Sequence, residues 1–273
     1  MSFVFGVLAA VTNAGQALVS KGLASRLPAR QLIGPLYLAN SLVLLPAAPF
    51  VAWTWSGEIL MLTGVSVALM AVSAIAVWDM FEAGSASAAT TALALSPIAT
   101  TLGVAALAPD SFRPAQAVAA VVVTIGVLIG LRGAFAGIGR FGTALRVVAA
   151  AWGNGLLTVC AHLLGDAGVG VVETYVVRTA IAALLFLTLI PPREIPWSEA
   201  PRLAVRSIVV TAYFVFVILG AQSGSPVVVQ TLVATTPLVL LAYEAARDRA
   251  RPPGRGLAAS AIVIIGVAIT VVL

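Results

Sequence analysis

Residues 84–127 read GSASAATTALALSPIATTLGVAALAPDSFRPAQAVAAVVVTIGV, and residues 224–267 read GSPVVVQTLVATTPLVLLAYEAARDRARPPGRGLAASAIVIIGV. A shift of 140 residues aligns the two stretches with 12 identities in 44 positions. About four identities would be expected by chance in a chain so rich in alanine, valine and leucine. Scarcer residues are among the matches, since Pro97 aligns with Pro237 and Gly126 with Gly266. The pattern indicates an internal duplication.

The composition predicts an integral membrane protein. Of 273 residues, 61% are hydrophobic and only 9% are charged, and the mean hydropathy is +1.09. A soluble domain has about 45–50% apolar and about 25% charged residues, and a disordered chain is more polar still. The net charge of +5 is not gathered into a basic, aromatic-rich patch, so we expect the lipid bilayer, and no nucleic acid, as a partner.

The distribution of charges predicts ten transmembrane helices. A helix needs about 20 apolar residues to cross a bilayer. The stretches without Asp, Glu, Lys or Arg are 2–20, 31–57, 59–78, 83–109, 114–131, 147–165, 179–192, 207–243 and 256–273. Extending the seventh stretch back to Thr174 admits only Arg178 and makes it long enough to span. The eighth has 37 residues, and its Gly220, Gly224 and Pro226 divide it in two.

The basic residues predict the orientation of these spans. Thirteen of the 15 Lys and Arg residues fall in odd-numbered connections, whereas the even-numbered ones carry only Arg113. The thirteen are Lys21, Arg26, Arg30, Arg132, Arg140, Arg146, Arg193, Arg202, Arg206, Arg247, Arg249, Arg251 and Arg255. Positive charge favours the cytoplasmic side. We therefore expect a multi-pass protein of the cytoplasmic (inner) cell membrane, with odd-numbered loops cytoplasmic and both termini outside.

The duplication and the span count together predict two repeats of opposite orientation. Residues 1–135 form the first five-helix repeat, 136–140 a linker, and 141–273 the second. Because five is odd, the second repeat must enter the membrane from the opposite side. Inverted repeats are typical of secondary transporters, whose substrate path lies at the repeat interface. The alternative is a convergent hydrophobic pattern in two unrelated five-helix bundles.

The two quoted stretches resemble the EamA-type transporters of the drug/metabolite transporter superfamily. Each is similar to the family pattern of a small-residue helix, a proline, a short polar turn and a glycine-containing helix. The resemblance implies an all-α integral membrane fold of ten transmembrane helices as two inverted five-helix repeats. It also implies transport of a small organic metabolite, such as an amino acid, more often outward. The chain departs from the family in lacking its Gly-Glu turn and in the side on which its basic residues lie.

Arg178 is the first candidate for substrate binding. An ionisable group inside a membrane helix costs about 2.5–3.5 kcal/mol and invites a functional interpretation. Tyr175 lies three residues earlier on the same helical face, so the two could hold a substrate carboxylate. Alternatively, Arg178 is structural and pairs with Glu173, Asp166 or backbone carbonyls.

Further polar and aromatic residues inside the expected helices are candidates to line a cavity. They are Asn13, Gln16, Asn40, Asn154, Trp152, Tyr213 and Trp78. The amides could equally join helices by hydrogen bonds, and Trp78 could belong to an interfacial belt. Because so few carboxylates lie in the membrane, we expect a neutral or zwitterionic substrate.

Two prolines are candidates for hinges, and two titratable residues are candidates for a proton relay. Pro97 and Pro237 fall within expected helices at matching repeat positions, so we expect kinks that act as hinges. His162, the single histidine, and Glu82 are candidates for a proton relay, with interfacial capping as the alternative for each.

The leading functional prediction is a secondary transporter that moves a small molecule by alternating access, with proton coupling as an option, and that is a monomer or homodimer. Alternatives are a translocator of a lipid or lipid-linked carrier and a quaternary-amine uptake carrier. No phosphate-binding loop, metal-ligand spacing or cofactor motif is present in the sequence. An intramembrane hydrolase would need His162 with a serine such as Ser223 or Ser225, so we expect no enzyme.

Overall fold

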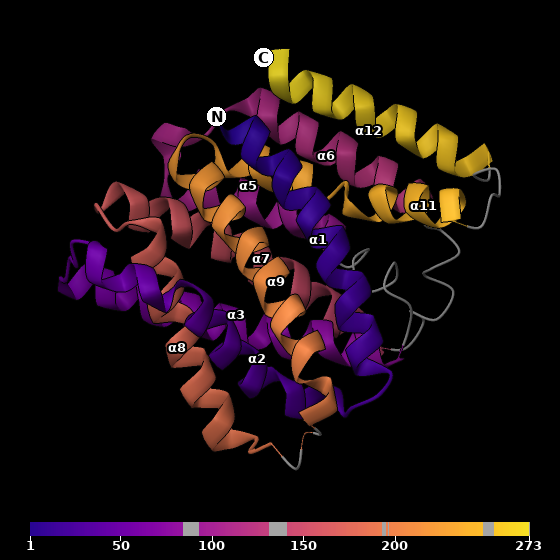
Figure 1. Cartoon of the computed structure of the whole chain (residues 1–273). Coiled ribbons are helices and arrows are strands. Elements are labelled where there is room, and N and C mark those ends of the chain that lie inside the picture. Colours follow the sequence, from indigo (N-terminus) through magenta and orange to yellow (C-terminus); the bar gives the residue numbers. More distant parts are fainter. Residues whose placement is uncertain (84–92, 131–140, 193–194, 196, 248–253, 273) are drawn as a thin grey trace.

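The fold is a bundle of helices (Figure 1). The computed structural model describes residues 1–83, 93–130, 141–192, 195, 197–247 and 254–272, and none of these residues is in a β-strand. Seven helical segments are long and apolar enough to cross a membrane. They are α1 (Ser2–Ala24), α2 with η1 (Ala29–Leu44 and Leu45–Phe50), α3 (Gly57–Ala83), α7 (Phe141–Asp166), α8 (Val171–Leu189), α9 (Ala200–Gln222), and α10 with α11 (Pro226–Val233 and Thr236–Arg247).

Three further helices contribute shorter apolar stretches, Leu93–Leu107, Pro114–Ile129 and Ala258–Ile269. The helices are α5 (Ser96–Leu107, preceded by η2, Leu93–Leu95), α6 (Pro114–Gly130) and α12 (Gly254–Val272). The expectation of an all-α membrane protein is therefore met, with seven spans visible by length and composition. The predicted linker at 136–140, and Gly84, Ser85 and Thr91 of the repeat, lie outside the described residues.

The long charge-free stretch divides where its glycines and proline predict. Helix α9 ends at Gln222 and α10 begins at Pro226. The Ser225 hydroxyl accepts a hydrogen bond from the Val228 amide, and Pro226 occupies the first turn, where no amide donor is needed. The two helices then pack closely, because a Cβ on Gly220 would lie 2.6 Å from Val229 Cγ2.

The two matching prolines each lie in the first turn of a described helix, in place of the helix interior expected from the sequence; their role as hinges stays a prediction. Pro97 is the second residue of α5, and Pro237 is the second residue of α11. Proline is tolerated in a first helical turn because its missing N–H has no partner there. In the second half, the helix is interrupted at Ala234–Thr235, between α10 and α11.

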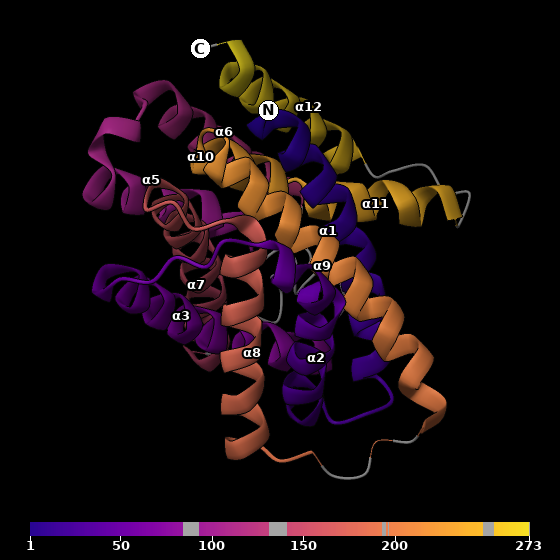
Figure 2. The same cartoon turned by 60° about the vertical axis from the view of Figure 1, so that its left-hand side comes forward.

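Helices from the two halves are closely interwoven. Helix α2 packs on α8, and these are the second helices of the two halves. Helix α6 packs on α12, and these are the last helices of the two halves. Helix α1 packs on α9, and α3 packs on α7. In both pairs, the first long helix of one half contacts the third of the other half. Figures 1 and 2 both place the two termini at one end, and the α1–α2 connection, the end of α8 and the start of α9 at the other.

Two carboxylates tie the halves together at the end opposite the termini. Asp79 of α3 accepts two hydrogen bonds from Arg30 at 3.0 Å and lies 3.4 Å from the Arg146 guanidinium of α7.

Glu199, at the start of α9, is held in the same way by one arginine from each half. Arg202 donates to both of its oxygens at 2.8 Å, and Arg26 lies at 3.5 Å. The hydrogen bond from Arg202 lowers the pKa of Glu199, so the carboxylate stays ionised at neutral pH.

Gly155 allows α7 to approach α5, which supplies a test of the packing. A Cβ on Gly155 would lie 2.6 Å from the Ser96 carbonyl oxygen and 2.8 Å from Ala99 Cβ, and backbone cannot move cheaply. We expect Gly155→Ala to lower the free energy of unfolding by about 1–3 kcal/mol. Gly64→Ala in α3 is the matched control, because nothing lies within 4 Å of its added Cβ. Thermal unfolding in detergent would measure both; equal midpoints would contradict the packing.

Candidate functional site

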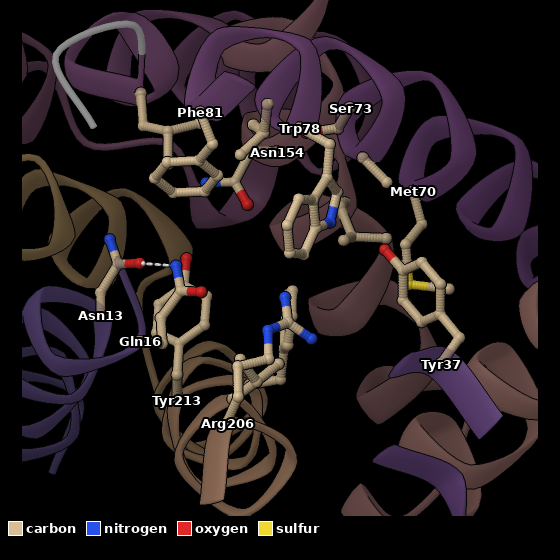
Figure 3. A pocket seen from close by; sticks show the side chains of 16 residues that line it. Asn13, Gln16, Tyr37, Met70, Ser73, Trp78, Phe81, Asn154, Arg206 and Tyr213 are labelled. Atoms are coloured by element: carbon tan, nitrogen blue, oxygen red, sulfur yellow. Dashed lines mark hydrogen bonds between the residues drawn. The ribbon is translucent and has the colours of Figure 1, made fainter. Parts of the chain in front are cut away.

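A cavity lies among α1, α2, α3, α7 and α9, so both halves of the chain contribute walls (Figure 3). Its interior volume is about 70 Å³, well below the roughly 300–1,000 Å³ of ligand pockets, so the walls must move apart to admit an organic molecule. The lining residues are Asn13, Gln16, Tyr37, Met70, Ser73, Ala74, Val77, Trp78, Phe81, Leu93, Asn154, Leu157, Arg206, Val210, Tyr213 and Phe214. The wall is thus largely aromatic and aliphatic, with a few polar groups and one charge.

That charge belongs to Arg206, which the sequence had assigned to the seventh connection as an orientation signal. The structure corrects this, because Arg206 is the seventh residue of α9 and is only 8% exposed. Pro201 in the first turn of α9 is the signal that could have revealed this earlier helix start.

The Arg206 guanidinium stacks over the Trp78 ring, with its carbon 5.3 Å from the ring centroid. Its Nε donates to Ser20 Oγ at 3.2 Å. No carboxylate among the described residues lies within 4.0 Å of it, although a buried charge is normally paired. The cavity therefore holds a cation whose counter-charge the described part of the protein does not provide.

A chain of polar side chains leads from Arg206 along α1 to the interruption between α10 and α11. Ser20 Oγ donates to Gln16 Oε1 at 3.3 Å, and Gln16 Nε2 donates to Asn13 Oδ1 at 2.8 Å. Asn13 Nδ2 then donates to Thr236 Oγ1 at 3.0 Å, and the Thr236 hydroxyl donates to a carbonyl at the end of α10. Gln16 and Asn13 are thus held in fixed orientations, with the first turn of α11 at the end of the chain.

Two other polar groups at the cavity have no protein partner. Asn154 Nδ2 and Tyr213 Oη are buried and lie near each other, but not in the geometry of a full hydrogen bond, and neither bonds to another described residue. Figure 3 shows Asn154 and Arg206 pointing toward one another across the cavity, from α7 and α9. Buried polar groups are nearly always paired, so a bound molecule is the natural partner.

Five of the predicted site residues therefore surround one cavity: Asn13, Gln16, Trp78, Asn154 and Tyr213. Trp78 is 3% exposed and stacks on a cation, which excludes the interfacial-belt alternative for it. Trp152 does not join them; it is 43% exposed on the outside of α7.

Arg178, Tyr175 and Asn40 are buried beside the cavity and do not line it. Tyr175 Oη is hydrogen-bonded to Thr211 Oγ1 at 2.9 Å. Arg178 Nε and Nη1 make no hydrogen bond to a described residue. The Glu173 carboxylate accepts a hydrogen bond from the Thr54 amide and makes none with Arg178. The predicted pairing of Arg178 with Glu173 or Asp166 is therefore wrong for the described residues.

The two candidates for a proton relay lie far apart. Glu82 is exposed beside Asp79, close to Arg146 at the start of α7. His162 lies 16 residues further along α7, which corresponds to about 24 Å. Direct proton transfer between the two is therefore excluded in this conformation.

His162 also lacks the arrangement of a serine hydrolase. Its Nδ1 donates to the Ala221 carbonyl oxygen at 2.9 Å, and its Nε2 accepts from Ser111 Oγ at 3.1 Å, in place of Ser223 or Ser225. Asp166 lies 3.6 Å from the same Nε2 atom, whereas a catalytic triad needs the carboxylate at Nδ1. Within the described residues there is also no cluster of three metal-ligating side chains.

The unpaired state of Arg206 leads to a test of its role. We expect Arg206→Met to raise the free energy of unfolding by about 1–2 kcal/mol, because the variant removes the desolvation cost of a buried, unpaired charge. Thermal unfolding of the ligand-free protein in detergent would measure this. A lower midpoint would show instead that Arg206 stabilises the fold through Trp78 and Ser20.

Comparison with known proteins supports the fold alone. No protein-family model matches the chain. No curated protein matches it either. Among solved structures 17 chains match. One of them, described only as "Crystal structure of protein", aligns with a TM-score of 0.74 and 18% identity, covering 98% of this chain and 96% of its own.

Proposed function

We propose that the protein is a secondary transporter that carries a small organic molecule across the membrane by alternating access. The observation that carries this proposal is a cavity between the two halves whose Arg206, Asn154 and Tyr213 keep polar atoms without protein partners. Such a site suits a ligand that enters, exchanges these hydrogen bonds for its own, and leaves. We retain the resemblance to EamA-type transporters as part of this proposal.

The packing of the halves supports ten spans arranged as two inverted repeats. Equivalent helices of the two halves pack on each other in the pairs α2–α8 and α6–α12. If the two halves are interchanged, the pair α1–α9 becomes the pair α7–α3, which is also present. A two-fold axis in the membrane plane would produce this pattern, with the cavity close to the axis. In this proposal α5, α6 and α12 complete the spans beyond the seven already visible.

The interrupted segment α10–α11 supports movement at the site. Discontinuous helices are a common element of transporter sites, because their ends can move without breaking a continuous hydrogen-bond ladder. Here the break follows Val233, and Asn13 of the cavity wall is bonded to Thr236 just beyond it. A change at the cavity can therefore act on α11.

The ion pairs of Asp79 and Glu199 would then close one end of the pathway. Each carboxylate bridges an arginine of its own half and an arginine of the other half. We assign this end to the cytoplasm, because basic residues favour that side, with both termini outside. The removal of Arg206 from the charge count leaves twelve basic residues in the odd connections, so the bias persists.

Reciprocal accessibility tests alternating access. A single cysteine at cavity residue Ala74, in a Cys160→Ser background, would be labelled in proteoliposomes by a membrane-impermeant maleimide from either side in turn. We expect Asp79→Asn to raise the labelling rate several-fold from the ion-pair side and to lower it from the terminal side, because the two openings exclude each other.

Glu82→Gln is the matched control, since it removes a neighbouring exposed carboxylate for which the described residues show no ion pair. It should leave both rates unchanged. Faster labelling from both sides at once in Asp79→Asn would indicate a loosened bundle or a channel, and would contradict the transporter proposal.

A further inference from the structure

We propose that the cavity takes a small organic anion: a carboxylate bound by Arg206, an apolar or aromatic body, and no ammonium group. The inference rests on the proposed function and deepens it by naming the substrate class. It differs from the neutral or zwitterionic substrate that the sequence predicted, and the difference arises from the positions of the charged side chains in the structure.

The charges facing the cavity are of one sign. Arg206 is the sole ionised side chain among the lining residues, and none of them is Asp or Glu. A second buried cation, Arg178, lies behind the wall. The one carboxylate that is fully buried within a described membrane helix is Glu173, and it is bonded to the Thr54 amide. An ammonium group in this cavity would meet positive potential and no counter-ion, which costs binding free energy.

The free edge of Arg206 fits a carboxylate. Its Nε is occupied by Ser20, and its flat face lies on Trp78. No hydrogen bond joins either Nη group to a described residue, which leaves two parallel N–H donors of the kind that bind both oxygens of a carboxylate. Because the stacking and the Nε bond hold the guanidinium still, little side-chain freedom is lost on binding.

The remaining wall fits an uncharged body. Phe81, Leu93, Leu157 and Phe214 surround the space beside Arg206 with apolar surface. The arrangement therefore selects an anion with an apolar body over a cation or zwitterion of the same size.

Four probes that share a phenyl ring on a three-carbon chain separate these charge types. They are 3-phenylpropionate (anion), phenylalanine (zwitterion), 3-phenylpropylamine (cation) and 3-phenylpropionamide (neutral). We expect 3-phenylpropionate to give saturable binding by calorimetry and to raise the thermal midpoint of the purified full-length protein. The amine and the amide should bind about tenfold more weakly or worse, because they lose a charged hydrogen-bond pair worth that factor or more. Phenylalanine keeps the carboxylate and should also bind about tenfold more weakly, because its ammonium group is desolvated without a counter-ion.

Variants locate the binding at Arg206. Arg206→Gln should abolish the binding of 3-phenylpropionate, and Arg206→Lys should weaken it by about tenfold, because lysine keeps the charge but loses the two-pronged geometry. Arg113→Gln is the control, because Arg113 is exposed between α5 and α6, lies outside the cavity and belongs to neither ion-pair group; it should bind normally. Monodisperse elution and an unfolding transition would verify that each variant is folded.

The outcomes separate this inference from the proposed function. Equal binding of phenylalanine or the amide, in the unmodified protein, would overturn the anion inference and leave a small-molecule carrier standing. Absence of saturable 3-phenylpropionate binding would overturn it as well, and so would unaltered binding in Arg206→Gln. Failure of reciprocal cysteine labelling would instead contradict alternating access, whatever the probes show.

Discussion

The structure is organised around the buried cation that faces the cavity. Arg206 lies in an apolar wall, with its face on Trp78 and its Nε on Ser20, and no described carboxylate neutralises it. Burial of such a charge opposes folding, so the surrounding helices must supply the compensation through aromatic packing and hydrogen bonds. The same arrangement leaves two donors free toward the cavity. A cost in stability and a capacity for binding thus have one physical origin.

The polar chain along α1 extends the influence of that charge through the protein. Ser20, Gln16 and Asn13 each donate to the next acceptor, and the chain ends at Thr236, just beyond the helix interruption. At the far end of the bundle, Asp79 and Glu199 join the halves by ion pairs that are partly exposed and individually weak. A rigid, hydrogen-bonded centre and a breakable closure at one end are the parts that alternating access needs, and both are formed by contacts between the halves.

Much of the site could be predicted from polarity alone. Asn13, Gln16, Asn154 and Tyr213 stood out because an amide or hydroxyl inside an apolar helix needs a partner, and all four line the cavity. Helix rotation could not be predicted in the same way. Asn154 and Trp152 are two residues apart on α7, so they lie on nearly opposite faces, and only packing decided that the amide faces inward while the indole faces outward. For the same reason Arg178 was found beside the cavity and not in it.

The sequence by itself determined the membrane character of the chain, its helical class and the division after Gln222, because hydropathy, charge spacing and scarce prolines are local properties of the chain. Only the tertiary structure decided which arginine faces the cavity, that both matching prolines begin helices, and that Asp79 and Glu199 each join the two halves. These features depend on the rotation and tilt of helices far apart in sequence. That geometry is set by the packing of side chains and by close approaches such as Gly155 on Ser96, which no single segment contains.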